Sequence, residues 1–208
     1  MKNTKEKILE TALFLFNTQG LPQVTLRTIA KKMGISQGNL NYHFKKREDI
    51  IEALYFNLVH AIDESIGSKR EIESALQTLF TISETIMQNF YIYRFFLLDF
   101  VQIIRKNETI RNHYLQLTKQ REQEFTYFFE LLEKEGLMRK EVLLNEYKNL
   151  YKRFQILSDF WISSAQISNP KEKELKDAVS ENLDLITQAI FPYLTAMGQK
   201  EYHRIMGG

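Results

Sequence analysis

The segment GISQGNLNYHF, residues 34–44, holds an unusual density of hydrogen-bonding side chains. Three amides, a tyrosine and a histidine fall within it: Gln37, Asn39, Asn41, Tyr42 and His43. Each amide both donates and accepts, and burying several of them without partners would be costly, so the segment does not suit a hydrophobic core. An ordinary solvent-facing helix would favour lysine and glutamate. The segment therefore predicts a surface that hydrogen-bonds to a polar partner.

Catalytic and metal-binding patterns are not found elsewhere in the sequence. The four histidines share no metal-ligand spacing: His43, His60, His113 and His203. We find no glycine-rich phosphate loop and no paired-carboxylate motif. The sequence has no cysteine, which excludes disulfides and thiolate metal sites and favours a reducing compartment. These observations predict a protein that is not an enzyme and has no cofactor or metal.

Two short helices must position the polar segment. Thr25 is placed to cap the first of them, and Gly34 is placed to end it. Ser36 is placed to cap the second, which runs to about His43 with Leu40 facing inward. Two short helices around a glycine-containing turn are typical of a helix-turn-helix unit. The major groove of B-DNA admits one helix and displays distinguishable donors and acceptors, so we expect the amides to meet base edges there.

Charge is distributed unevenly along the chain. Residues 1–50 hold nine Lys/Arg and four Asp/Glu, a net charge of +5, whereas the remaining residues hold 19 and 22, a net charge of −3. A basic N-terminal part on a mildly acidic remainder favours contact between that part and a polyanion. Because charged helix faces are common, a merely solvated surface is an equal alternative.

Over residues 5–55 the sequence resembles the TetR-type bacterial transcriptional regulators. The resemblance rests on FNTQG at the end of the first helix, on VTLRTIAKKMGIS, and on GNLNYHFKKREDI. The residues of the last segment that match the family's common pattern or substitute closely are Gly38, Leu40, His43, Phe44, Glu48 and Ile50. Asn41 stands where tyrosine is usual, so one family contact lacks its usual side chain. Arg47 replaces a phosphate-binding lysine, keeps the charge, and can bind phosphate through two N–H groups.

The resemblance implies two sets of DNA contacts. The residues that would read base edges are Arg27, Gln37, Gly38, Asn39 and Tyr42. The residues that would hold phosphates are Thr25, Ser36, Asn41, His43, Lys46 and Arg47. Structural roles compete with these, because Thr25 and Ser36 are also N-caps. The lysines next to the motif can equally be solvated charge, and a lone histidine is more often structural.

Beyond residue 46 the sequence predicts a helical body. Before residue 46, a first helix capped by Thr4 is expected to end at Gly20. A helix over 47–66 is expected to connect residues 1–46 to the body. The further helices are expected at 69–89, 91–106, 108–135, 140–166 and 172–203, with Pro192 kinking the last. The expected fold is all-α, with a three-helix helix-turn-helix DNA-binding domain at 1–46 and a helical bundle for ligand binding and dimerisation at 47–208.

Aromatic residues are frequent between residues 80 and 161. Members of the family usually bind a small molecule between the middle helices, so the resemblance implies an effector pocket there. The candidate pocket residues are Phe80, Tyr91, Phe95, Phe96, Asp99, Phe100, His113, Phe128, Phe154 and Trp161. Alternatively, aromatic residues at helical spacing form the core, and Asp99 makes an internal salt bridge or a helix-end bond.

The last two predicted helices carry apolar residues over a wide face. In the family these helices normally form a two-fold dimer, and a dimer suits a pseudo-palindromic operator. The candidate interface residues are Leu157, Phe160, Leu183, Ile186 and Ile190. Packing within one chain explains the same pattern nearly as well.

The residues and the resemblance together predict a sequence-specific transcriptional regulator. We expect a ligand-responsive repressor that binds a pseudo-palindromic operator as a homodimer and is released by a small, largely apolar effector. An activator, or a helical DNA-binding or interaction protein without a ligand, is the alternative. The start MKNTKEKILE carries no secretion signal and no apolar run is long enough to cross a bilayer, so we expect a cytoplasmic protein without a membrane partner.

Overall fold

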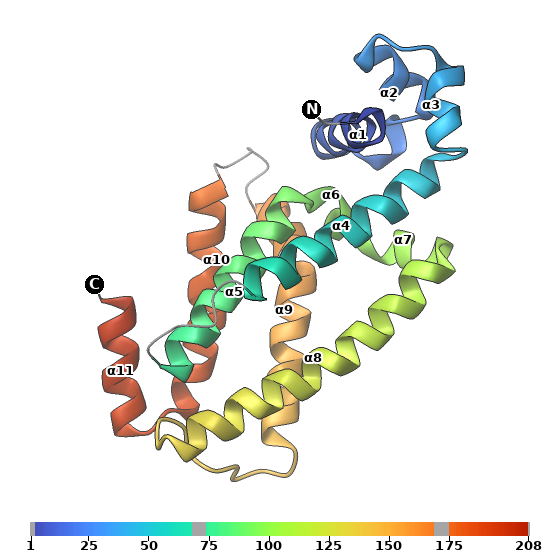
Figure 1. The fold of residues 1–208 in the computed structure, drawn as a ribbon. Helices are drawn as coiled ribbons and strands as arrows, with labels where there is room; N and C mark the ends of the chain where they lie inside the picture. Colours follow the sequence, from blue (N-terminus) through green and yellow to red (C-terminus); the bar gives the residue numbers. More distant parts are fainter. Residues whose placement is uncertain (1–2, 68–73, 169–174, 208) are drawn as a thin grey trace.

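Helices form the regular elements of the chain in the computed structural model, which describes residues 3–67, 74–168 and 175–207 (Figure 1). Within these ranges the only β-pairing is an isolated bridge between Met138 and Leu194. The predicted all-α fold is therefore confirmed. In the same ranges, no helix combines the length and the hydrophobicity needed to cross a membrane.

The N-terminal helices α1 (Thr4–Gln19), α2 (Leu26–Met33) and α3 (Gln37–His43) form a small unit that we call the head. A short 3-10 turn, η1 (Leu21–Gln23), links α1 to α2. The head is held together by apolar side chains that are almost fully buried: Ile8, Ala12, Phe16, Ile29, Leu40 and Phe44. Burial of these residues fixes which faces of α2 and α3 remain outside.

Helix ends in the head follow from capping side chains. Thr25 Oγ1 accepts a hydrogen bond from the Thr28 backbone N–H at 3.2 Å, and Ser36 Oγ accepts one from the Asn39 N–H at 3.1 Å. Both predicted caps are therefore confirmed. Gly34 ends α2 at φ 68°, a left-handed conformation that costs glycine little. The prediction for α1 was wrong by one residue, because Asn3 rather than Thr4 is its N-cap and forms a capping box with Glu6.

Helix α4 (Arg47–Gly67) runs from the head into the rest of the chain, which we call the body (Figure 1). Its predicted apolar side is buried, including Ile50, Leu54 and Leu58. The Asp49 carboxylate accepts hydrogen bonds from the Lys45 and Lys46 backbone N–H groups at 3.1 Å each, which stabilises the start of the helix.

The body contains the remaining helices, and α5 packs against both α4 and α10 (Figure 1). Their bounds are α5 (Ala75–Ile92), α6 (Arg94–Leu98), α7 (Phe100–Lys106), α8 (Glu108–Lys134), α9 (Glu146–Ser168), α10 (Leu175–Ile190), η2 (Phe191–Tyr193) and α11 (Ala196–Met206). The helix predicted over 108–135 agrees with α8. The starts predicted at residues 69 and 172 lie outside the described residues.

Three predicted helices of the body differ from the structure. The single helix expected over 91–106 is divided into α6 and α7 at Asp99, whose φ and ψ are −106° and 17°. The helix expected over 172–203 is not merely kinked, because Pro192 lies in the 3-10 turn η2 that separates α10 from α11. The helix expected from residue 140 begins at Glu146, because Asn145 adopts a left-handed φ of 58° just before it.

Candidate functional site

The predicted recognition surface of the head is the outer face of α3. Leu40 is fully buried, whereas Gln37, Asn39 and Tyr42 are exposed, with 80% of Tyr42 accessible. Arg27 on α2 is exposed as well. These exposed side chains are therefore left free of the head's own core, in a position to meet another molecule.

Gly38 on the same face has no steric reason to be glycine within the chain. A Cβ built at this position would find Ser36 Oγ as its nearest neighbour, at 3.9 Å, which is an ordinary contact. Because Gly38 has no side chain, the backbone of α3 is directly accessible at this point. A partner can then approach the helix backbone closely.

The residues expected at phosphates lie around this face in two environments. Thr25, Ser36 and Lys46 are exposed, while Asn41 and His43 are partly buried. The rings of Tyr42 and His43 meet edge-to-face with centroids 5.2 Å apart. Within the described residues the buried Oδ1 of Asn41 has no hydrogen-bond partner. Three of these five residues are therefore freely accessible, and two are partly covered by the head.

Arg47 lies apart from the other expected phosphate contacts. Its guanidinium donates to the backbone carbonyls of Leu21 at 3.0 Å and Val24 at 3.3 Å, and it lies 3.3 Å from the Glu48 carboxylate. Arg47 therefore braces the loop that leads into α2. Burial raises the pKa of Asp99 above its ordinary value, and the positive charge of Arg47 opposes that rise. Nothing in the local sequence indicated this bracing role.

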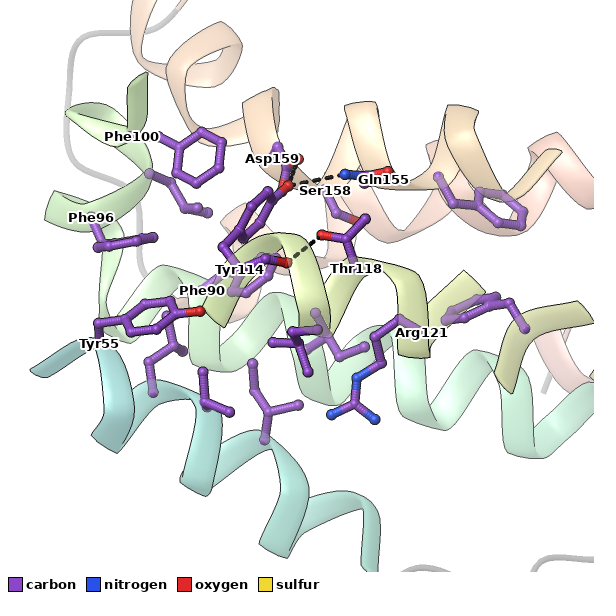
Figure 2. Close-up of a pocket in the computed structure, with 18 of the residues that line it drawn as sticks. Tyr55, Phe90, Phe96, Phe100, Tyr114, Thr118, Arg121, Gln155, Ser158 and Asp159 are labelled. Carbon is purple, nitrogen blue, oxygen red and sulfur yellow. Dashed lines mark hydrogen bonds between the residues drawn. The ribbon is translucent and has the colours of Figure 1, made fainter. Parts of the chain in front are cut away.

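A cavity of about 140 Å³ lies in the body between α4, α5, α6, α7, α8 and α9 (Figure 2). Its lining is mainly apolar and aromatic, with a few polar side chains from α8 and α9. The lining residues are Tyr55, Leu58, Val59, Ile62, Ile86, Phe90, Phe96, Leu97, Phe100, Tyr114, Leu117, Thr118, Arg121, Phe125, Tyr151, Phe154, Gln155, Ser158 and Asp159. Such a lining is typical of sites for small, largely apolar molecules.

Three of the expected pocket residues line this cavity: Phe96, Phe100 and Phe154. The others do not line it and have different surroundings. The ring of Phe80 packs against Tyr202 at 5.6 Å, and Tyr91 stacks on Trp161 at 6.4 Å. Phe95 faces the head, where its ring lies 5.0 Å from that of Phe16. Helical spacing identified an aromatic region but not which of its faces borders a cavity.

His113, Asp99 and Phe128 also lie outside the cavity lining. His113 Nδ1 is 2.8 Å from the hydroxyl of Tyr55, which does line the cavity. Asp99 stands at the junction of α6 and α7. Phe128 is half-buried on α8, next to the ring of Tyr127. Of these, only His113 is shown in hydrogen-bond contact with the lining.

The polar end of the cavity is formed by Asp159, Tyr114 and Gln155 (Figure 2). The Tyr114 hydroxyl donates to Asp159 Oδ2 at 2.6 Å, and Gln155 Nε2 donates to the Tyr114 oxygen at 3.0 Å. Burial raises the pKa of Asp159 to about 6. Sequence reasoning missed this carboxylate, although an acid between Leu157 and Trp161 carries the same signal that singled out Asp99.

The cavity and the head share the segment around α6. Asn17 Nδ2 donates to the Ile92 carbonyl at 2.8 Å, and Asn17 Oδ1 accepts from the Phe95 N–H at 3.0 Å. Phe96 lines the cavity, while the neighbouring Phe95 packs on Phe16 of α1. Neighbouring residues of α6 therefore contact the cavity and α1 of the head.

The expected interface residues of α9 and α10 divide into buried and accessible groups. Ile190 has no accessible surface in the single chain and Ile186 is buried, so both pack inside the body. Leu157 and Leu183 are half-buried, whereas 44% of Phe160 is accessible. Three exposed apolar side chains follow one outer face of α9 at spacings of four and seven: Ile156, Phe160 and Ile167.

A basic helix-turn-helix unit with an exposed polar helix is typical of DNA-binding transcriptional regulators. Residues 8–54 match the family described as bacterial regulatory proteins, tetR family, and residues 58–202 match the TetR family described as bacterial transcriptional repressor. The chain belongs to the TetR family. The predicted family is thereby confirmed, as is the prediction that the protein is not an enzyme.

Individual relatives agree with this assignment. A probable HTH-type transcriptional regulator of Bacillus subtilis, YttP, is 26% identical over 148 residues, 68% of each chain. An uncharacterized HTH-type transcriptional regulator of Pseudomonas putida, TtgW, is 32% identical over 79 residues. That match covers 36% of this chain and 59% of TtgW.

Solved structures show the same fold. A TetR-family regulator from Marinobacter aquaeolei VT8 superposes with a TM-score of 0.86 at 21% identity, covering 98% of this chain and 97% of that one. A putative transcriptional regulator from Saccharomonospora viridis, solved in complex with choline, gives 0.70 at 21% identity, covering 92% and 97%. At this level of identity the likeness concerns the fold alone.

Proposed function

We propose that this regulator is a ligand-responsive repressor that binds a pseudo-palindromic operator as a homodimer in the cytoplasm. The observation that carries the proposal is the outer face of α3, where Gln37, Asn39 and Tyr42 are exposed while Leu40 anchors the helix from behind. A repressor of this kind occupies its operator and blocks transcription until an effector binds the body and lowers the affinity of the heads for DNA.

Within this proposal the two sets of DNA contacts have different tasks. Arg27, Gln37, Gly38, Asn39 and Tyr42 read base edges, and Thr25, Ser36, Asn41, His43, Lys46 and Arg47 hold phosphates. The exposure of most of these side chains supports the assignment. Arg47 fits it differently, because its contacts with the Leu21 and Val24 carbonyls also set the position of α2.

The proposed division into a head at 1–46 and a body at 47–208 rests on α4, which starts at Arg47 and continues into the body. The proposed homodimer uses the outer face of α9, where Ile156, Phe160 and Ile167 are exposed. A row of exposed apolar residues on one helix supports an interface with a second copy. Two copies joined in this way would present two heads to one operator.

The proposed effector is a small, largely apolar molecule that binds in the cavity of the body. The aromatic lining supports this, and so does the position of α6 between the cavity and α1. An effector that favours a displaced α6 would draw Phe95 away from Phe16 and turn the head. The heads of the dimer would then no longer fit adjacent major-groove positions.

Selection of bound DNA from a random pool by the purified protein tests this proposal. We expect a pseudo-palindromic sequence whose half-sites lie about one helical turn apart, roughly 34 Å. Placed across a promoter in a reporter cell, that sequence should lower transcription when the protein is present. Recovery of no preferred sequence, or higher transcription from the reporter, would overturn the proposal.

A further inference from the structure

The carboxylate of Asp159 borders the cavity without a counter-charge. Only 9% of the residue is accessible, and its carboxylate accepts a hydrogen bond from the neutral hydroxyl of Tyr114, which in turn accepts one from the neutral amide of Gln155. No lysine, arginine or histidine of the described chain forms an ion pair with it. A buried anion that has hydrogen bonds but no cationic partner is costly to the fold, so a cation supplied from outside would be favoured there.

The other charged lining residue does not balance Asp159. Arg121 already forms ion pairs with Asp63 and with Glu124, the latter at 2.6 Å. The two carboxylates carry two negative charges, which exceed the single positive charge of Arg121. The charged groups in and around the described lining therefore sum to a negative value, which favours a positively charged occupant over a neutral or an anionic one.

Aromatic rings line the same cavity as this carboxylate. Phe100 lies edge-on to Tyr114 with centroids 5.0 Å apart, and Phe96 stacks on Tyr55 at 5.2 Å. Faces of phenyl and phenol rings attract cations, and the attraction grows when the cation is desolvated. The lining thus offers both parts of a site for an organic cation, a fixed negative charge and aromatic faces.

We propose that the cavity binds a small organic cation, an aryl- or alkylammonium compound, with its nitrogen at Asp159 and its apolar part among the aromatic rings. The proposal rests on the proposed function in taking this cavity as the effector site, and it specifies the chemical class of the effector. The free volume of about 140 Å³ suits the apolar part, because an engineered cavity of about 150 Å³ in another protein holds benzene.

A purely structural role for Asp159 makes a different prediction. The hydrogen bond from Tyr114 joins α8 to α9, and an asparagine at position 159 can accept the same bond through its amide oxygen. If the carboxylate only ties these helices together, Asp159→Asn should change ligand binding little. If the charge binds the ligand, the same substitution should weaken the binding of cations alone.

Three ligands of nearly equal size separate these cases in a titration of the full-length protein, followed by ligand-observed NMR. Phenethylammonium is the cation, propylbenzene its neutral isostere and 3-phenylpropanoate the anion. We expect the wild-type protein to bind the cation at least tenfold more tightly than the other two. Asp159→Asn should reduce affinity for the cation at least tenfold and change affinity for propylbenzene less than twofold.

Two further variants serve as controls. Tyr114→Phe removes the hydrogen bond but keeps the charge, so it should retain the preference for the cation. Asp184→Asn removes an exposed acid from α10 and should bind all three ligands like the wild type. Equal binding of cation and isostere by the wild type, or unchanged cation binding by Asp159→Asn, would overturn the proposal.

Operator binding measured with the same ligands separates this proposal from the proposed function. Charge-dependent binding at Asp159 without any change in operator affinity would support the ligand class and contradict ligand-responsive repression. Release of the operator by the neutral or anionic compound, with no preference for the cation, would support the response and overturn the ligand class.

Discussion

At the scale of single residues, Asp159 links protonation to the stability of the ligand-free fold. Burial raises its pKa to about 6, against about 3.9 for an aspartate in an unfolded chain. Between these values the folded protein binds a proton that the unfolded chain has lost. The stabilisation that this proton provides is complete below about pH 4 and is lost as the pH rises through about 6.

We therefore expect Asp159→Asn, which cannot ionise, to become more stable than the wild type as the pH rises. The two free energies of unfolding should be similar near pH 4, and the variant should be higher by about 2 to 3 kcal/mol at pH 8. Chemical denaturation across this range measures the difference, with Asp184→Asn as the control for loss of an exposed acid. A difference that stays constant from pH 4 to pH 8 would contradict the expectation.

Residues of the recognition surface should differ in what they contribute to DNA binding. Arg27→Ala and Tyr42→Ala should weaken binding to the selected operator by about 1 to 3 kcal/mol and binding to random DNA much less, because base contacts carry the specificity. Lys46→Ala should weaken both by the same factor and reduce the salt dependence by about one charge. Parallel losses from all three variants would rule out this division.

The role of a site residue could be predicted from the sequence when its contacts lie close to it in the chain, and not when they lie far away. The polar face of α3 was readable because spacing and local caps decide which side chains point outward. The surroundings of Arg47 were not, since its guanidinium reaches carbonyls at Leu21 and Val24, more than twenty positions earlier in the chain. Asp159 could have been found, because an acid within the apolar run of α9 signals a buried charge.

At the scale of elements, the break between α5 and α6 depends on a residue of the head. Asn17 accepts from the free N–H of Phe95 and donates to the free carbonyl of Ile92, so it satisfies both sides of the break. The sequence around residue 93 contains no glycine or proline that would mark a helix end. The prediction therefore placed this break too early, between helices at 69–89 and 91–106, whereas α2 and α3 carry their own stop and start signals.

Substitution of Asn17 should weaken communication between the two parts of the chain. In Asn17→Ala the effector should still bind the cavity, but the effector-induced change in operator affinity should fall several-fold, since typical couplings amount to about 1 to 3 kcal/mol. Thr18→Ala is a matched control, because the Thr18 hydroxyl bonds only within α1. Operator titrations with and without effector measure the coupling. An unchanged ratio in Asn17→Ala would exclude this route.

At the scale of the whole molecule, the head lies at one end of α4 and α9 runs through the body away from it (Figure 1). The outer face of α9 is apolar at Ile156, of which 60% is accessible, and Leu185 on α10 is an exposed apolar residue as well. A single chain leaves these side chains in water. A second copy placed against them would cover both and add a second head.

We expect the double variant Ile156→Glu/Leu185→Glu to be monomeric, because two charges on each copy would have to be buried in the interface. Its operator affinity should fall at least tenfold, while its helix content remains that of the wild type. Leu144→Glu, at an exposed apolar position in the loop before α9, is the control and should stay dimeric. Sedimentation velocity gives the mass of each species, and a dimeric double variant would contradict the proposed interface.

The only tryptophan of the sequence, Trp161, has a consequence for observing the protein. It is buried two positions from Asp159, stacks on Tyr91, and its indole N–H has no hydrogen-bond partner within the described chain. Light at the long-wavelength edge of aromatic absorption would therefore excite the buried indole of Trp161 alone. The wavelength and intensity of intrinsic tryptophan fluorescence therefore report on this one site, and no dye has to be attached.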